Sequence, residues 1–110
     1  MRIGDVVGER GKKVSGRLPV GKTTSQIPVE LPVTIVMGQR PGPTLVVSGG
    51  VHGREIVGTL GLGRVLREVD PEAMSGNLIA VPLANMSSFE FGDRISLWDD
   101  ENLEDAGIGD

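Results

Sequence analysis

The chain has 110 residues, which suffices for one domain with a modest core and is too short for two ordinary domains. Its net charge is −4, 38% of its residues are apolar, and it has no cysteine, so disulfides and thiolate zinc sites are excluded. No apolar stretch approaches the roughly 18 residues that a bilayer span requires, and the first residues lack the apolar core of a secretory signal. We therefore expect a soluble, cytoplasmic protein that does not bind membranes.

The negative charge is concentrated at the C-terminal end. Residues 99–110 hold six acids and no base, which leaves nine acids against eleven bases in residues 1–98. There is no basic stripe, and the aromatic side chains that could stack on bases are Phe89, Phe91 and Trp98. Nucleic-acid binding is therefore not favoured. We expect residues 99–110 to form a solvated or disordered tail.

Short strands and turns are predicted for the first half of the chain. Residues 13–21 favour a short strand, and residues 31–37 are rich in β-branched side chains typical of another. Pro28 and Pro32 rule out a central ladder position before that run. Residues 38–43 have the composition of a turn. Residues 44–50 form a short apolar run that predicts a strand buried on both faces.

The period then becomes helical. Apolar residues at helical spacing predict a helix over residues 54–69, which Asp70 and Pro71 end. Three glycines within it predict close packing of its backbone against a sheet. Residues 77–85 predict a second buried strand, so that strand, helix and strand form a βαβ unit. Because ligands of such sheets gather at the carboxyl ends of the strands, His52, Glu55 and Asn85 are the candidate site residues.

A histidine followed three residues later by a glutamate, in "VHGRE", has the donor types that zinc prefers. His52 on the strand-to-helix turn and Glu55 in the first helical turn can point into one crevice. The alternative is that the pair is accidental, since the helix dipole alone favours an acid in a first turn. The residues by themselves leave both interpretations open.

The blocks "GPTLVVSGGVHGREIVG", "LREVDPEAMSGNLIAVPLAN" and "FEFGDR" resemble the N-terminal part of the succinylglutamate desuccinylase and aspartoacylase family, over roughly residues 27–105. These proteins are zinc-dependent deacylases related in fold to the zinc carboxypeptidases. The resemblance implies an α/β fold: a partial, truncated zinc-carboxypeptidase-like (phosphorylase/hydrolase-like) sheet of mixed strands with a βαβ unit. We expect a lead segment with short strands over 1–26, a partial deacylase-type domain over 27–98, and the acidic tail over 99–110.

The resemblance also implies roles for individual residues. His52 and Glu55 match the family's first two zinc ligands. Arg94 falls where the family has an arginine that polarises the scissile carbonyl, a catalytic role suited to a fixed cation. Asn85 matches an asparagine for which a structural role is expected. Arg54 resembles the arginine in the His-x-Arg-Glu of carboxypeptidases, and a solvated surface position is the alternative for both arginines.

Two departures separate the chain from the family pattern. Glu104 and Asp105 stand where the family has an Asn-Arg pair that binds the substrate carboxylate, and an acid repels such a group. The family's third zinc ligand and its glutamate general base have no counterpart, since His52 is the only histidine. Oxygen donors such as Asp99, Asp100 or Glu101 would be an unusual replacement.

Two functions therefore remain open. The first is a zinc-dependent amidohydrolase of the deacylase type, in which water activated by the metal attacks an amide or ester of a small acylated substrate, with this chain as a part that is inactive alone. The second is a degenerate, non-catalytic half-domain with a binding or structural role. A weaker third interpretation, an anion cradle in "SGGVHGREIVG", is disfavoured because Glu55 would repel phosphate. For either of the first two we expect self-association or completion by a second chain, because an incomplete sheet leaves an edge.

Overall fold

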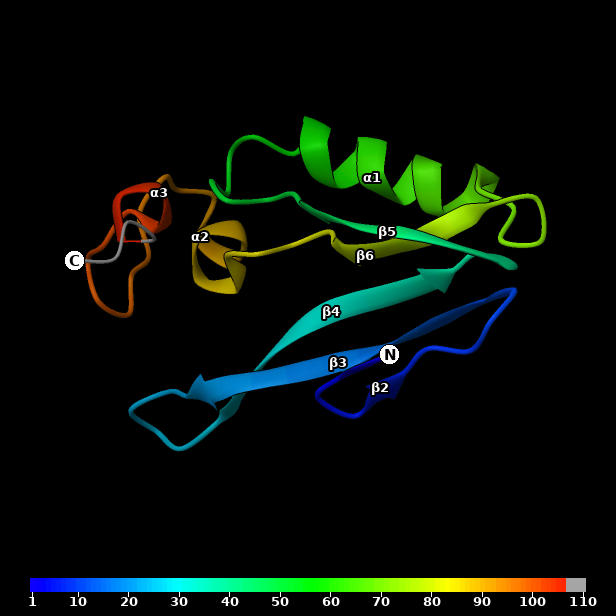
Figure 1. Cartoon of the computed structure of the whole chain (residues 1–110). Coiled ribbons are helices and arrows are strands. Elements are labelled where there is room, and N and C mark those ends of the chain that lie inside the picture. Colours follow the sequence, from blue (N-terminus) through cyan, green and yellow to red (C-terminus); the bar gives the residue numbers. More distant parts are fainter. Residues whose placement is uncertain (107–110) are drawn as a thin grey trace.

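Four strands form the mixed sheet on which the molecule is built, in the order β3-β4-β6-β5 (Figure 1). The structure is a computed structural model that describes residues 1–106. The strands of the sheet are β3 (Lys12–Lys22), β4 (Pro28–Met37), β5 (Arg40–Ser48) and β6 (Ser75–Val81). β4 runs antiparallel to both β3 and β6, whereas β5 and β6 are parallel. The predicted mixed α/β sheet is therefore confirmed.

The hairpin of β3 and β4 is longer than the sequence predicts. Ten residue pairs join its strands, from Lys12 opposite Met37 to Lys22 opposite Pro28. β4 pairs with β6 only from Thr34 onward, so Pro28 and Pro32 both lie where β3 is the one strand beside β4 among residues 1–106. The missing N–H groups of the two prolines therefore cost no hydrogen bond to β6. The expected strand over residues 31–37 is the second part of β4. From Thr34 onward this part pairs with both β3 and β6.

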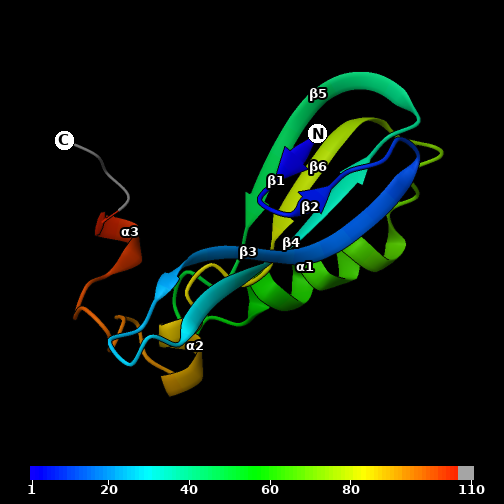
Figure 2. The same ribbon diagram turned by 90° about the horizontal axis from the view of Figure 1, so that it is seen from below.

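One cluster of buried apolar residues lies between the sheet and the N-terminal segment. β1 (Arg2–Ile3) and β2 (Val6–Val7) form a small antiparallel pair on the face of the sheet opposite α1 (Figures 1 and 2). Buried Val6 packs there with Val33 and Ile35 of β4. Val33 and Ile35 are two residues apart, so they share a face of the strand. The first 26 residues thus pack on the same sheet as the rest of the chain.

The predicted βαβ unit is confirmed as β5-α1-β6. α1 (Val57–Glu68) begins three residues later than expected, since Glu55 N–H bonds back to the carbonyl of His52 and Ile56 is the N-cap. The expectation that Glu55 lies in the first helical turn is therefore wrong. Gly58, in the first turn of α1, packs closely against Gly49, which follows β5. A methyl group added at Gly49 would lie 3.0 Å from the carbonyl carbon of Gly58.

The other two helical glycines do not pack against the sheet. A methyl group at Gly61 would meet no atom within 4 Å, and at Gly63 it would meet only the end of the Arg67 side chain. The predicted close packing of the α1 backbone is thus confined to its first turn. We find no structural reason for glycine at position 61.

β5 is an edge strand in the part of the chain that the structure describes. It pairs with β6 alone, and Leu45 and Val46 are each 62% exposed. The expectation of a strand buried on both faces is therefore wrong, as is the turn over residues 38–43, because β5 already begins at Arg40. An apolar run in a sequence shows that its side chains are suited to burial. It does not show whether a neighbouring strand or helix covers them.

β5 and β6 both end toward the same side of the molecule as the tip of the β3–β4 hairpin. α2 (Met86–Phe91) and α3 (Leu103–Ala106) lie at this end (Figure 1). β6 stops at Val81, four residues before the predicted end, and Asn85 instead caps α2. No helix among residues 1–106 is long and apolar enough to cross a membrane.

Candidate functional site

The loop between β5 and α1 holds the candidate residues on a tightly packed backbone. Gly50 has φ of +66°, a conformation that favours glycine. At Gly53, a Cβ atom would lie 1.8 Å from the carbonyl oxygen of Ser88. The Gly53 N–H donates to Ser88 Oγ at 2.7 Å and to the carbonyl of Asp93 at 2.8 Å. These contacts attach the loop to α2 and fix where its side chains point.

The imidazole of His52 has a hydrogen-bonding partner at each ring nitrogen. Its side chain is 11% exposed, and its Nδ1 contacts the carboxylate of Glu55, three residues later. Its Nε2 lies 3.0 Å from Oδ1 of Asn102 and 3.5 Å from the carboxylate of Glu104. His52 and Glu55 are thus brought together, as the sequence predicts.

These partners raise the pKa of His52 above its ordinary value. The largest cause is the hydrogen bond to Asn102, followed by the hydrogen bond to Glu55, and the negative charge of Glu55 adds to the effect. Desolvation and the positive charge of Arg94 act in the opposite direction and lower the pKa. Oxygen acceptors on both sides of the ring favour the doubly protonated form, since each accepts a hydrogen bond from an N–H group.

Arg94 faces the same hollow as His52 and Glu55. The hollow has a volume of about 740 Å³ and is also lined by Glu104 and Leu103. The Arg94 guanidinium lies 3.7 Å from the Glu104 carboxylate, in a pair whose side chains are 66% and 62% exposed. The acid that replaces the expected asparagine therefore lies between the arginine and the histidine, where it contacts both.

Asn85 and Arg54 hold the backbone. The Asn85 amide donates to the carbonyl of Val51 at 3.1 Å, and its oxygen accepts from the N–H of Ser88 at 3.0 Å. The structural role expected for Asn85 follows from these two bonds. Arg54 Nε donates to the carbonyl of Gly92 at 2.7 Å, so its guanidinium joins the loop to the end of α2.

Residues 99–105 of the expected acidic tail are mostly exposed, as expected of a solvated segment, but part of this segment contacts the loop after β5. Asn102 and Glu104 fold back onto His52, and Leu103–Ala106 form α3. Residues 107–110 of the expected tail lie outside the described part of the chain. The sequence carries no motif that marks Asn102 as a partner of a histidine 50 residues earlier, and the buried Ser88 likewise lacks a sequence signal.

The donor set at this site fits part of a zinc site. An imidazole nitrogen and a carboxylate oxygen are ligand types that zinc accepts, and catalytic zinc sites use three protein ligands. Within residues 1–106, no group of three or more His, Cys, Asp or Glu side chains is arranged to hold a metal ion. Glu55 and Glu104 contact opposite nitrogens of the His52 ring, so the two acids do not converge on one point with it. His52 and Glu55 thus have the donor types of two of the three positions.

The fold and the sequence agree on the relatives of this chain. Residues 41–104 match the succinylglutamate desuccinylase/aspartoacylase catalytic domain. The chain belongs to this family. Its whole length superposes on 34% of a succinylglutamate desuccinylase/aspartoacylase structure from Rhodobacter sphaeroides, with a TM-score of 0.84 and 28% identity. A product-bound ectoine utilization protein from Ruegeria pomeroyi matches 96% of the chain, over 34% of its own length, with a TM-score of 0.74 and 26% identity.

A curated relative gives the same assignment. The N-alpha-acetyl-L-2,4-diaminobutyric acid deacetylase of Halomonas elongata is 35% identical over 82 residues, which are 74% of this chain and 24% of the relative. These matches confirm the predicted family and its partial fold. The family consists of zinc-dependent deacylases. The chain spans about a quarter of the curated relative and about a third of the solved structures.

Proposed function

We propose that this chain forms the N-terminal, metal-binding part of a zinc-dependent deacylase that hydrolyses a linear amide. The observation that supports the proposal is the convergence of His52, Glu55 and Arg94 on one hollow at the end of β5, within a family fold. In this proposal His52 and Glu55 supply two zinc ligands. The third ligand and the general base come from polypeptide outside residues 1–106.

The chain's own residues would then perform three tasks. His52 would bind through the nitrogen facing Glu55, while Asn102 accepts a hydrogen bond from the other nitrogen and fixes the orientation of the ring. Arg94 would direct its guanidinium at the carbonyl oxygen and stabilise the negative charge that develops there. The bound zinc would supply Lewis acidity and lower the pKa of a water molecule.

The substrate class follows from the charges at the hollow. Glu104 offsets the positive charge of Arg94, so the hollow favours a substrate that carries a cationic group in addition to any carboxylate. An N-acylated amine with a second, charged amino group meets this requirement, and N-alpha-acetyl-L-2,4-diaminobutyric acid, named for the Halomonas elongata relative, is the natural first compound to assay.

A non-catalytic half-domain is the second candidate. It is favoured by the same Glu104, whose carboxylate pairs with Arg94 and so competes with a substrate for that cation. In this case the loop of His52 would serve the fold rather than a reaction. The two candidate functions predict different zinc binding by the chain.

Zinc stoichiometry and affinity decide between them. Metal analysis after dialysis and titration calorimetry should give saturable zinc binding that His52→Ala removes and Glu55→Gln weakens. Glu72→Gln is the matched control, since Glu72 is exposed and does not line the hollow. Zinc binding that is equal in the chain and in His52→Ala would contradict the metal site and leave the half-domain.

Hydrolysis is then tested in an assembly with the missing part of the fold. The C-terminal two-thirds of the Rhodobacter sphaeroides relative, mixed with this chain, would supply the other site residues. Release of acetate from N-alpha-acetyl-L-2,4-diaminobutyric acid that depends on His52 and Arg94 would support the deacylase. A zinc-loaded, stable assembly without hydrolysis would support the non-catalytic candidate.

A further inference from the structure

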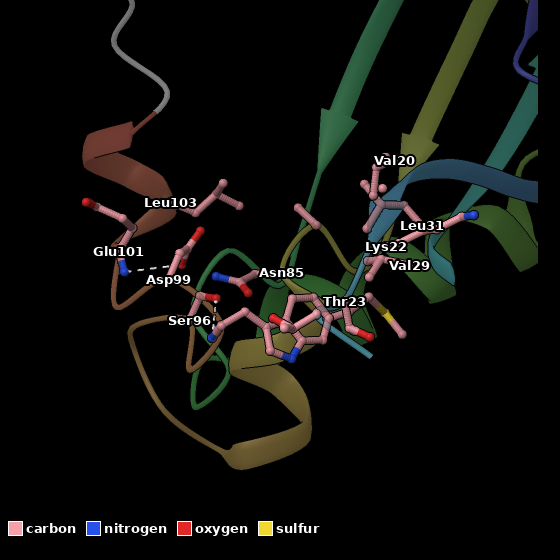
Figure 3. A pocket seen from close by; sticks show the side chains of 15 residues that line it. Val20, Lys22, Thr23, Val29, Leu31, Asn85, Ser96, Asp99, Glu101 and Leu103 are labelled. Carbon is pink, nitrogen blue, oxygen red and sulfur yellow. Dashed lines mark hydrogen bonds between the residues drawn. The ribbon is translucent and has the colours of Figure 1, made fainter. Parts of the chain in front are cut away.

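A second cavity adjoins the hollow that contains His52. It has a volume of about 630 Å³ and lies between the tip of the β3–β4 hairpin and the segment that precedes α3. Figure 3 shows Val20, Val29 and Leu31 on the hairpin side, with Leu103 across from them. Ala84 and Leu103 line both cavities. A molecule bound beside His52 can therefore extend into the second cavity without leaving the protein surface.

The wall of this cavity combines apolar and polar side chains. Its apolar side chains come from three separate segments of the chain: Val20, Val29, Leu31, Met86, Trp98 and Leu103. Val20 is 53% and Trp98 50% exposed, so both present apolar surface that a ligand can contact. The volume of the cavity lies within the range of roughly 300–1,000 Å³ that is usual for small-molecule sites.

Most polar side chains of the wall already hold hydrogen bonds within the protein. The Asn85 amide bonds to two backbone groups, at 3.0 and 3.1 Å. Thr23 and Asp99 each accept one bond from a backbone N–H, at 3.1 and 3.3 Å. Ser96 Oγ bonds to a serine hydroxyl and to a backbone N–H, each at 3.2 Å. The groups left to bind a ligand are therefore the apolar side chains and the exposed charged ones, Lys22, Asp99 and Glu101.

We infer that this cavity binds an apolar substituent of the amide whose carbonyl lies at His52, Glu55 and Arg94. The inference rests on the proposed deacylase function for the position of the amide, and it adds an apolar group of several carbons to the substrate. Lys22 and Glu101 lie at exposed positions of the wall, so the charged ends of such a substrate stay in contact with water. Transfer of the apolar group from water into the cavity provides the affinity.

The test uses Trp98 as a reporter in the full chain. Trp98 is the only tryptophan and there is no tyrosine, so the near-ultraviolet emission of the protein comes from this wall of the cavity. The probes are N-hexanoylglycine and its isomer N-acetyl-L-norleucine, which carry the same apolar carbons on the acyl side and on the amine side of the amide. N-acetylglycine is the short reference. We expect one isomer to change the emission saturably and to bind roughly tenfold or more tighter than N-acetylglycine.

Two variants locate the binding. Val20→Glu places a charge in the cavity wall and should weaken the better isomer roughly tenfold or more. Val7→Glu is the matched control, because Val7 is 50% exposed on a strand outside the cavity, and it should bind as the unchanged chain does. Equal affinity for all three probes, or equal weakening by both variants, overturns the inference. So does a change in emission with protein concentration alone, which would place a second copy of the chain in the cavity.

These measurements are made without zinc, so the inference and the proposed function can fail separately. Binding of a long probe that persists in His52→Ala supports the cavity, whatever zinc does. Zinc binding that requires His52, together with no preference for an apolar probe, supports the metal site and overturns the cavity.

Discussion

Oδ1 of Asn102 lies 3.0 Å from Nε2 of His52, and this contact joins the segment before α3 to the loop that follows β5. It is the largest cause of the raised pKa of His52. Because the folded pKa is raised, the interaction stabilises the fold fully below the unfolded pKa of about 6.5 and is lost as the pH rises through the folded pKa. Asn102 thus links the protonation of a candidate metal ligand to the packing of the C-terminal segment.

We predict that Asn102→Ala lowers the pKa of His52 and reduces the pH dependence of stability between mildly acidic and mildly alkaline conditions. Asn102→Asp should raise the pKa further, because a carboxylate favours the imidazolium. Since His52 is the only histidine, a single imidazole signal in an NMR titration reports the value. Asn77→Ala is the control, because the Asn77 amide bonds to Thr44, far from the hollow. A pKa that is unchanged in Asn102→Ala would show that this contact does not govern His52.

The part of the site that lies in a local sequence motif could be predicted from the sequence. His52 and Glu55 are three residues apart on a glycine-rich turn, so their meeting depends only on the loop. Asn102 could not be predicted, because its contact depends on how residues 92–101 return across the molecule. The exposure of Leu45 and Val46 could not be predicted either. The burial of a strand depends on neighbouring elements, which the residues of the strand itself do not specify.

The second prediction concerns Gly53. Gly53→Ala places a methyl group 1.8 Å from the Ser88 carbonyl oxygen, so either the loop or α2 must shift. We expect a loss of about 1–3 kcal/mol in the free energy of unfolding, measured by urea denaturation. Gly61→Ala is the matched control in open space, and it should raise the free energy of unfolding by about 1 kcal/mol through helix propensity. Equal stability of the two variants would be inconsistent with the close contact.

Glu104 gives a third prediction. Its carboxylate pairs with Arg94, and removal of that charge leaves the guanidinium available to a bound anion. We expect Glu104→Gln to strengthen the binding of acetate roughly two- to fivefold, a small effect because both side chains are largely exposed. The chemical shift of His52 in the same hollow can report the titration. Glu72→Gln removes the same charge elsewhere, and an equal gain in that control would assign the effect to net charge alone.

Ser88 gives a fourth prediction. It is fully buried, and its hydroxyl accepts from the Gly53 N–H at 2.7 Å and donates to the carbonyl of Asp93. Ser88→Ala removes both bonds and should lower the free energy of unfolding by about 1–3 kcal/mol. Ser25→Ala, at an exposed position of the hairpin tip, should leave stability unchanged. Thermal and urea unfolding of the two variants would compare them, and a Ser88→Ala chain as stable as Ser25→Ala would contradict the anchoring of the loop to α2.

The exposed edge of the sheet gives the last prediction. β5 has β6 as its one neighbour among residues 1–106, so the backbone groups of its other edge have no strand to pair with in that part of the chain. Leu45 and Val46 add exposed apolar surface beside them, and an edge of this kind favours pairing with another chain. We expect the mass in sedimentation equilibrium to rise with protein concentration. Val46→Lys should reduce that rise, because a charge on an edge strand opposes pairing, whereas Val7→Lys at similar exposure should not. A monomer at every concentration with cooperative unfolding would show that β5 is stable as an open edge.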